Sequence, residues 1–267
     1  MEIGWLRILP FDKPDRNDRC MLLDNNTDCI VLNKVNKSFG DKQVLKDVSL
    51  SVPYGCIYGL LGPSGCGKTT TVKIMAGISE SNSGDTYVLG EKMPRLSLMN
   101  EIGYMAQSDA LYMALTAADN LEFFAAIYGM KKAQYKNRIL EVMEIIGLAE
   151  DLNKPVGAYS GGMKRRLSLA MAILHNPKVL ILDEPTVGID PLLRQDIWKE
   201  LYRMAENGVT ILVTTHVMDE ALKCHRLGMM RAGVLTAEGT PDELQKRIGA
   251  ASIEEAFIRY GGGCLED

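Results

Sequence analysis

Residues 62–69 constrain what this chain can fold into more than any other stretch of its sequence. They read GPSGCGKT, a glycine, four free positions and then Gly-Lys-Thr, which is the pattern of a phosphate-binding loop. Glycines in such a loop turn backbone N–H groups toward phosphate oxygens, and the following helix adds the positive end of its dipole. The pattern predicts a bound nucleoside triphosphate, held by Gly62, Pro63, Ser64, Gly65, Cys66, Gly67, Lys68, Thr69 and Thr70.

The sequence on either side of the loop predicts the strand and the helix between which a phosphate-binding loop lies. Residues 56–61 are mostly apolar and favour a buried strand, and residues 69–76 favour a helix that ends at Gly77. Lys68 would supply a mobile cation and Thr69 a hydroxyl for Mg²⁺. A glycine turn without function is the alternative, and the strand–loop–helix context makes it the less favoured one.

Composition narrows the class of protein. The chain has 267 residues, of which 46% are hydrophobic and 24% charged, as in ordinary globular proteins. It contains no apolar run near the roughly 18 residues that span a bilayer, and its first residues lack a basic segment followed by a secretory apolar run. We therefore expect a cytoplasmic location, in which the six cysteines are free thiols.

Charge argues weakly against nucleic acid as a partner. The net charge is -4, whereas binding to a phosphate backbone favours a basic face. The longest basic cluster is Lys164-Arg165-Arg166, which we interpret as a solvated helix face.

The hydrophobic pattern predicts three regions. Residues 1–29 form an N-terminal extension, either a short amphipathic element on a membrane or partner or, more simply, a loosely packed segment. Residues 30–245 form the main domain, and residues 246–267 a helical tail. Short apolar runs before and after the loop predict strands, some of them in an antiparallel flank, at 30–35, 48–52, 56–61 and 86–89.

Beyond Thr116 the pattern becomes helical. Thr116 and Asp119 are spaced as a capping box, and helical periodicity continues to Gly147 and again after Ser160, so a helical subdomain is expected over about residues 111–168. Strands follow at 179–182 and 209–213, separated by a helix from Pro191 to about Glu206, and this alternation predicts a parallel sheet with crossover helices. The predicted fold class is α/β, a P-loop NTPase core with a mainly parallel sheet, an antiparallel flank and an inserted helical subdomain. Two capped helices end the chain, with caps at Thr240 and Ser252.

Polar residues follow several buried runs at the point where each predicted strand ends. They are Gln107, the pair Asp183 and Glu184, and His216. Ligands of open parallel sheets bind at the carboxyl ends of the strands, so these side chains should converge on the phosphate loop. Taken singly, each has another reading, Gln107 as a solvated loop residue and Asp183 or His216 as a helix cap.

This set has the equipment of a hydrolase. Neighbouring residues of an extended strand point opposite ways, so Asp183 should face Mg²⁺ while Glu184 orients the attacking water. His216 would contact the γ-phosphate. A phosphate-loop kinase acting on a small molecule is an alternative that uses the same loop.

Ser160-Gly161-Gly162 is a second unusual feature. Two glycines in the first turn of a helix cost roughly 1 kcal/mol each relative to alanine, which indicates a close backbone approach. A helix N-terminus capped by serine is an anion site, most simply for a γ-phosphate presented by another copy. A flexible hinge is the alternative.

From Ile30 onward the chain resembles the ATP-binding subunit of an ABC transporter, with the motifs in the family's order. The resemblance assigns adenine stacking to Phe39, catalysis to Lys68, Glu184 and His216, and Mg²⁺ binding to Thr69, Gln107 and Asp183. It also places Asp190 in the D-loop, which follows Asp183 and Glu184 in the sequence. The signature, which closes the other copy's site, consists of Tyr159, Ser160, Gly161, Gly162 and Met163.

The departures from the family's pattern are small. The signature usually reads Leu-Ser-Gly-Gly-Gln, and here Tyr159 and Met163 replace its outer residues while the Ser-Gly-Gly anion contact remains. Phe39 replaces the commoner tyrosine but keeps the ring that stacks. The variant signature and the tail resemble the exporter branch that moves drugs, lipids, polysaccharides or sodium.

The resemblance also implies partners. ATP and Mg²⁺ are the expected cofactors, and a second ATPase subunit, identical or a paralogue, would pair head to tail with this one. A transmembrane permease subunit on a separate chain would hold this chain at the cytoplasmic face of the membrane. Its docking groove would involve Leu111, Tyr112, Met113 and Met130, for which core filling is the alternative. The other reading within the family is a soluble ABC ATPase that acts on ribosomes or DNA.

Overall fold

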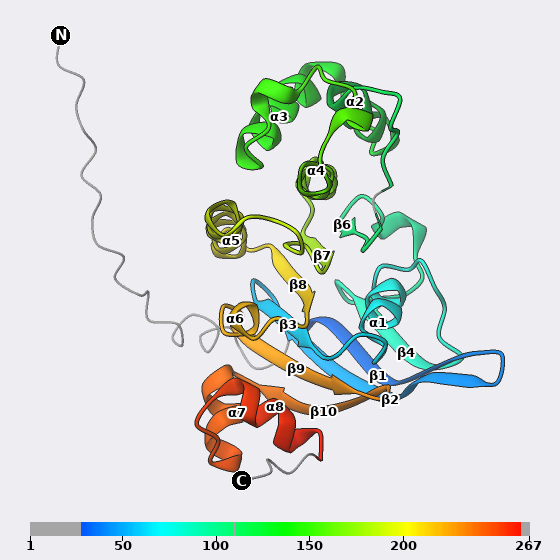
Figure 1. The fold of residues 1–267 in the computed structure, drawn as a ribbon. Helices are drawn as coiled ribbons and strands as arrows, with labels where there is room; N and C mark the ends of the chain where they lie inside the picture. The colour runs from blue at the N-terminus through cyan, green and yellow to red at the C-terminus, as the bar shows by residue number, and fades with distance from the viewer. Residues whose placement is uncertain (1–27, 109, 263–267) are drawn as a thin grey trace.

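The computed structural model describes residues 28–108 and 110–262, which form two sheets with helices around them (Figure 1). The smaller sheet has the order β2-β1-β4-β5, and its neighbouring strands are antiparallel. It confirms the predicted antiparallel flank. Its strands are β1 (Asp28–Phe39), β2 (Lys42–Pro53), β4 (Ser83–Val88) and β5 (Glu91–Lys92).

The larger sheet has the order β10-β9-β3-β8-β7-β6 and is parallel except at one edge, where β10 pairs antiparallel with β9. Its central strands are buried along their whole length, as expected for a parallel sheet covered on both faces. Its strands are β3 (Ile57–Leu61), β6 (Ile102–Met105), β7 (Val179–Asp183), β8 (Thr210–Thr215), β9 (Arg226–Arg231) and β10 (Val234–Gly239).

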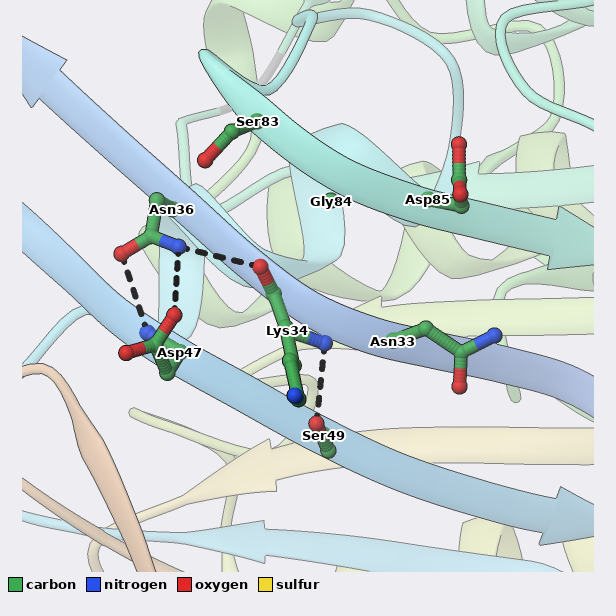
Figure 2. A pocket seen from close by; sticks show the side chains of 8 residues that line it. All are labelled: Asn33, Lys34, Asn36, Asp47, Ser49, Ser83, Gly84 and Asp85. Atoms are coloured by element: carbon green, nitrogen blue, oxygen red, sulfur yellow. Dashed lines mark hydrogen bonds between the residues drawn. The ribbon is translucent and has the colours of Figure 1, made fainter.

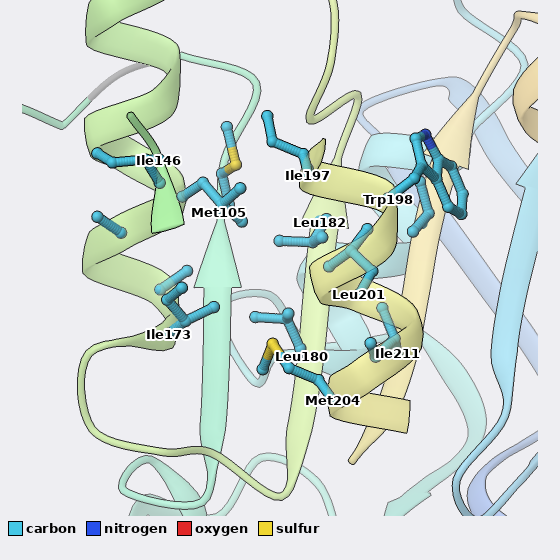
Figure 3. Close-up of a cluster of buried hydrophobic side chains, with 14 of the residues drawn as sticks. Met105, Ile146, Ile173, Leu180, Leu182, Ile197, Trp198, Leu201, Met204 and Ile211 are labelled. Atoms are coloured by element: carbon cyan, nitrogen blue, oxygen red, sulfur yellow. The ribbon is translucent and has the colours of Figure 1, made fainter. Parts of the chain in front are cut away.

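The strands of the larger sheet divide their side chains between two cores because successive residues of a strand point to opposite faces. On β7, Val179 and Ile181 join the core shared with the smaller sheet and with α1 (Lys68–Met75). Leu180 and Leu182 join the core on the other face, against α5 (Pro191–Glu206) and α4 (Gly161–Ile173) (Figure 3). The predicted α/β core with a mainly parallel sheet is thus confirmed.

A group of helices stands apart from the sheets, at the top of the view in Figure 1. It consists of α2 (Ala117–Ile127), α3 (Lys132–Ile145) and the start of α4. The predicted capping box is present, with Thr116 and Asp119 each accepting the other's backbone N–H. The expected end of the helical subdomain at residue 168 falls inside α4, whose later turns contact β6 and β7.

Shorter helices complete the described chain. Beyond β8 comes the short α6 (Met218–Ala221), and beyond β10 the chain forms α7 (Pro241–Ile248) and α8 (Ile253–Tyr260), which pack together beside β10. The caps predicted at Thr240 and Ser252 are both present. The expected boundary at residue 245 falls inside α7.

Two expectations fall wholly or partly outside the described residues. Residues 1–27 of the expected extension lie outside them, while residues 28 and 29 belong to β1. Four cysteines are described, all of them buried and none joined to another in a disulfide, namely Cys29, Cys56, Cys66 and Cys224. Within the described ranges, every helix is too short or too polar to cross a membrane.

Candidate functional site

The phosphate loop lies between β3 and α1, as its pattern predicts. Gly65 and Gly67 adopt φ values of +77° and +112°, a region that side chains rarely occupy, and a Cβ on Gly67 would lie 2.7 Å from Leu45. The loop curls around its own lysine, because Lys68 Nζ donates to the carbonyl oxygens of Gly62 at 2.7 Å and Pro63 at 3.1 Å.

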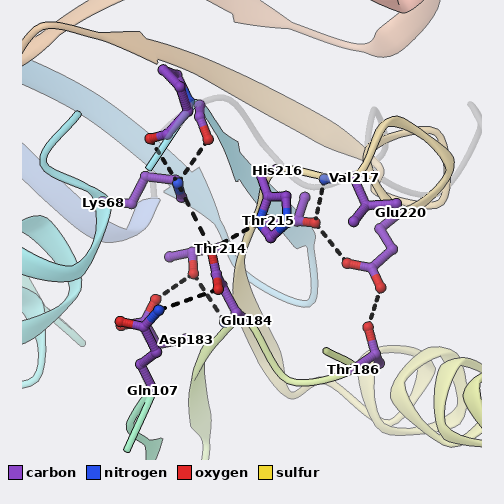
Figure 4. Close-up of polar contacts among 12 residues, drawn as sticks. Lys68, Gln107, Asp183, Glu184, Thr186, Thr214, Thr215, His216, Val217 and Glu220 are labelled. Atoms are coloured by element: carbon purple, nitrogen blue, oxygen red, sulfur yellow. Dashed lines mark hydrogen bonds and ion pairs between the residues drawn. The ribbon is translucent and has the colours of Figure 1, made fainter. Parts of the chain in front are cut away.

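The polar side chains at the ends of β6, β7 and β8 meet at Glu184 (Figure 4). One carboxylate oxygen of Glu184 lies 3.0 Å from His216 Nδ1 and 4.0 Å from Lys68 Nζ. The other accepts a hydrogen bond of 3.3 Å from Gln107 Nε2. Four residues chosen from separate parts of the sequence therefore form one cluster beside the phosphate loop.

Asp183 and Glu184 are not neighbours on one extended strand, so that part of the prediction is wrong. Strand β7 ends at Asp183, and Glu184 has φ +53°, so the pair does not alternate along an extended strand. Glu184 N–H donates to Thr214 Oγ1 at 3.0 Å, which fixes the turn. A non-glycine residue with positive φ stores strain that concentrates at functional sites, and here it aims the Glu184 carboxylate at the loop.

Asp183 is fully buried, and only one of its carboxylate oxygens is satisfied within the described chain. Oδ1 accepts from Thr214 Oγ1, while Oδ2 has no hydrogen-bond partner among the described residues. A buried carboxylate oxygen without a partner is costly unless a cation or its bound water completes it. Because Mg²⁺ prefers oxygen donors, Asp183 Oδ2 is a candidate ligand for it.

The N-terminus of α4 is open, as the Ser-Gly-Gly sequence predicts. Ser160 Oγ accepts from the Met163 N–H at 3.2 Å, and space around Gly161 is free. The close backbone approach occurs at Gly162, where a Cβ would lie 3.0 Å from the carbonyl oxygen of Gly188. That contact joins the signature to the segment that leads to Asp190.

The outer residues of the signature are structural, and Asp190 is a helix cap. Tyr159 is buried, and its hydroxyl donates to the carbonyl oxygen of Asp151 at 2.8 Å. Burial raises the pKa of Tyr159 to about 12, so the hydroxyl stays protonated. Met163 packs against the core, and Asp190 accepts from the Leu193 N–H at the start of α5.

Phe39 ends β1 with 57% of its surface exposed. Lys37 Nζ lies 5.1 Å from the centroid of its ring. The ring is therefore available for stacking.

Arg165 is a site residue that was not predicted, and the interpretation of residues 164–166 as a solvated helix face is wrong at this position. Arg165 is buried, and its guanidinium donates to the carbonyl oxygens of Ala106, Gln107, Asp183 and Glu184. It thereby fixes the backbone on both sides of the site. Its helical spacing, four residues before the apolar Leu169, is a signal that could have suggested that it faces inward.

A polar hollow of about 600 Å³ lies elsewhere, over the smaller sheet (Figure 2). Several of its polar groups bond to one another, since the Asn36 side chain donates to Asp47 at 2.8 Å and Ser49 Oγ accepts from the Lys34 backbone N–H at 2.9 Å. The hollow lies where the pairing of β1 with β2 shifts register twice, with Lys34 at the first shift and Asp47 at the second, each with φ +47°.

Fold and site together define an α/β phosphate-loop nucleotide-binding protein. Among solved structures, an ATP-binding subunit of an ABC transporter is similar, with a TM-score of 0.81 and 26% identity over 87% of this chain and 99% of that one. A dimeric ATP-binding cassette in a post-hydrolysis state with ADP and Pi has a TM-score of 0.74 and 26% identity over 79% of this chain and 98% of that one.

Sequence comparisons agree. Residues 45–187 match the model of the ABC transporter family. The probable multidrug ABC transporter ATP-binding protein YbhF of Escherichia coli is 40% identical over 85% of this chain and 40% of its own length, so this chain spans about two fifths of that relative. The linearmycin resistance ATP-binding protein LnrL of Bacillus subtilis is 38% identical over 84% of this chain and 76% of its own length.

A third relative, the Nod factor export ATP-binding protein I of Rhizobium meliloti, is 38% identical over 97% of this chain and 78% of its own length. The chain belongs to the ABC transporter family, and within it to the ATP-binding proteins. The predicted resemblance is confirmed.

Proposed function

We propose that this chain hydrolyses MgATP and that, paired head to tail with a second ATP-binding chain, it drives export through a separate membrane subunit. The observation that carries the proposal is the convergence at Glu184, whose carboxylate lies 3.0 Å from His216 Nδ1 and 3.3 Å from Gln107 Nε2 beside the phosphate loop. Such a cluster of titratable and amide groups next to a phosphate site is the arrangement of a hydrolase.

The loop and Phe39 would bind the nucleotide. The backbone N–H groups of residues 62–70 would cradle the phosphates at the N-terminus of α1, and Phe39 would stack on the adenine. Lys68 would exchange the carbonyl oxygens of Gly62 and Pro63 for phosphate oxygens, which are the stronger acceptors because they are charged.

Catalysis would centre on Glu184. Its carboxylate would accept a hydrogen bond from the attacking water and hold that water in line with the γ-phosphate. Because His216 Nδ1 contacts Glu184, the imidazole can present Nε2 to the γ-phosphate. Lys68 would stabilise the charge that develops on the transferred phosphoryl group.

Mg²⁺ would be held by Thr69, Gln107 and Asp183. The unpartnered Asp183 Oδ2 supports this assignment because it is buried and needs a cation or a bound water. The ion would supply charge neutralisation at the phosphates. Within the described residues, no three His, Cys, Asp or Glu side chains cluster as metal ligands, so a cation here would rest on mixed oxygen donors.

A second copy, or a paralogue, would complete each site. The exposed N-terminus of α4 at Ser160 and Gly161 supports this proposal, since a helix N-terminus attracts anions and the space beside Gly161 is open to a γ-phosphate from the facing chain. Asp190 would lie near that interface. Similar cassettes have been solved as dimers.

A membrane subunit would dock on the helical subdomain, which would place this chain at the cytoplasmic face of the membrane. Tyr112, Met113 and Phe123 are each more than 40% exposed, and Tyr112 packs edge-to-face on Phe123 with ring centroids 5.0 Å apart. Leu111 and Met130 instead pack against the core, which favours the core-filling reading for those two. Relatives named for multidrug transport and for Nod factor export support the export direction.

Glu184→Gln tests the hydrolytic step. The amide keeps the shape and the hydrogen bond from Gln107 but cannot take up a proton, so phosphate release from MgATP should fall at least about 100-fold. Binding of MgATP, measured by titration, should stay within about threefold. Glu206→Gln, at the exposed end of α5, is the matched control and should hydrolyse ATP like the unaltered chain.

Two outcomes would contradict the proposal. Unchanged phosphate release in the Glu184→Gln protein would remove Glu184 from the mechanism. A phosphorylated small molecule that accumulates faster than free phosphate would favour a kinase instead.

A further inference from the structure

Glu220 is a buried carboxylate that the mechanism above does not use. It lies on α6, four residues after His216, and only 3% of it is exposed. One carboxylate oxygen accepts a hydrogen bond of 2.6 Å from Thr215 Oγ1, and the other accepts from Thr186 Oγ1 (Figure 4). Within the described chain it forms no ion pair with lysine or arginine. Burying a carboxylate is costly even when two hydroxyl groups donate to it, so the position of Glu220 calls for an explanation.

The first partner holds the backbone around His216. Thr215 Oγ1 donates to Glu220 and also accepts from the Val217 N–H at 3.0 Å. The Thr215 side chain and the Val217 amide therefore bracket His216 on both sides. Any shift of His216 along the chain must move the Glu220 carboxylate or break one of these hydrogen bonds.

The second partner lies in the segment between Glu184 and Asp190. Thr186 donates its hydroxyl proton to Glu220, and its carbonyl oxygen accepts from the Ile189 N–H at 3.2 Å. The turn that leads into Asp190 and α5 is thus attached to Glu220. In Figure 4, Glu220 stands between Thr186 and Thr215, which come from different segments of the chain.

Thr214 makes the parallel connection on the other face of β8. Its hydroxyl donates to Asp183 Oδ1 and accepts from the Glu184 N–H. Because neighbouring strand residues face opposite ways, Thr214 and Thr215 tie β8 to the 183–186 segment from both sides of the sheet. Thr214 contacts Asp183 and Glu184 directly, whereas Glu220 contacts Thr215 and Thr186, which are next to site residues in the sequence.

We propose that Glu220 is a positioning residue that joins the His216 loop to residues 186–190, so that a movement of His216 toward a γ-phosphate is transmitted to the Asp190 segment. The inference rests on the proposed ATPase function, in which His216 contacts the γ-phosphate. In this way hydrogen bonds through Glu220 would connect the nucleotide bound by this chain to the surface that would face a second copy. Glu220 itself touches no reacting atom.

Hydrogen exchange of backbone amides tests the connection without requiring turnover. The full chain is compared with and without Mg²⁺ and adenylyl imidodiphosphate, a non-hydrolysable ATP analogue. In the unaltered protein the analogue should slow exchange at Val217 and at residues 187–189 together. In Thr186→Val, slowing at Val217 should persist while slowing at residues 187–189 falls about tenfold, the factor expected when a hydrogen bond to a charged group is lost.

Thr210→Val is the matched control. Thr210 is also a fully buried threonine, on the same strand as Thr215 but at its opposite end, where its hydroxyl accepts from the Gly55 N–H at 3.0 Å. It should lose comparable stability and keep the analogue-induced slowing at residues 187–189. Equal effects of Thr186→Val and Thr210→Val on that slowing would overturn the inference, as would no effect of either.

Kinetics provide a second readout that a merely structural role would not produce. Thr186→Val should lower kcat for ATP hydrolysis about tenfold and leave KM within about twofold. Glu220→Gln should retain more activity than Glu220→Ala, because its amide can accept from Thr215 and donate to Thr186. Equal activity in the two Glu220 variants would contradict the positioning role. Failure of the unaltered chain to release phosphate would refute the proposed hydrolysis, whereas the exchange result would still decide whether the connection exists.

Discussion

Arg165 offers the sharpest test of how this site is held together. Its three guanidinium nitrogens donate to four backbone carbonyl oxygens at the ends of β6 and β7, among them those of Gln107 at 2.9 Å and Glu184 at 2.7 Å. Replacement by methionine keeps the apolar stem and removes every donor. The carbonyl oxygens, partly or wholly buried, would then lose the hydrogen bonds that Arg165 donates to them.

The expected loss of stability follows from those contacts. Hydrogen bonds to charged groups contribute about 1.5–3 kcal/mol each but are not additive, and some of the freed carbonyl groups can recruit water. We therefore expect Arg165→Met to lower the free energy of unfolding by about 3–5 kcal/mol. For a domain of this size that corresponds to a fall in Tm of about 6–20 °C. The Tm of Arg165→Lys should lie between those of the unaltered protein and Arg165→Met, since an ammonium group cannot reproduce the planar set of donors of a guanidinium.

Thermal unfolding followed by circular dichroism measures the effect, with Lys164→Met as the control. Lys164 is the adjacent basic residue, and its side chain makes no hydrogen bond or ion pair to the part of the chain described. That control should melt within about 2 °C of the unaltered protein. The reasoning would be refuted if Arg165→Met melted together with the Lys164→Met control.

Two further predictions concern ionisable groups. Burial against Tyr128, whose ring stacks on His175 at 3.7 Å, lowers the pKa of His175 from 6.5 to about 4, so the unfolded chain binds a proton before the folded chain does. Chemical unfolding should therefore show stability that is full above pH 6.5 and falls by up to about 3 kcal/mol toward pH 4, and His175→Phe should flatten that part of the profile. Asp183→Asn should fold, because its amide oxygen can still accept from Thr214, but titration should show that Mg²⁺ no longer tightens ATP binding, an effect of about tenfold or more.

Local sequence signals predicted the elements of this fold well. The capping residues Thr116, Thr240 and Ser252 start helices where their spacing places them, because a cap is satisfied by backbone groups within three residues. Helix α5 spans Pro191–Glu206, the range its pattern predicts. Such features depend only on neighbours in sequence.

The pairing of distant segments could not be predicted in the same way. Nothing in the sequence of β1 reveals that it lies between β2 and β4, since strand order depends on contacts across the whole domain. Arg165 illustrates the same limit, because a basic residue on a helix looks solvated until the carbonyl oxygens it meets are known. The positive φ of Glu184 likewise comes from the turn beyond β7, which no residue type there demands.

The candidate site was predicted in part. Its residues could be chosen because each follows a buried strand, and parallel strands bring their carboxyl ends together. The contacts that support them, from Arg165, Thr214 and Glu220, were not predicted, since threonine and glutamate are common at many positions for many reasons. The sequence thus indicated which side chains meet but not what orients them.

The central claim, that this chain is the ATP-driven part of an exporter, is tested most directly by finding its partner. The tagged chain would be recovered from native membranes in mild detergent with ATP present, and the proteins recovered with it would be identified by mass spectrometry. The account predicts a chain with several membrane spans, together with a second copy or paralogue of this one. Recovery of soluble chains, ribosomes or DNA alone would contradict it.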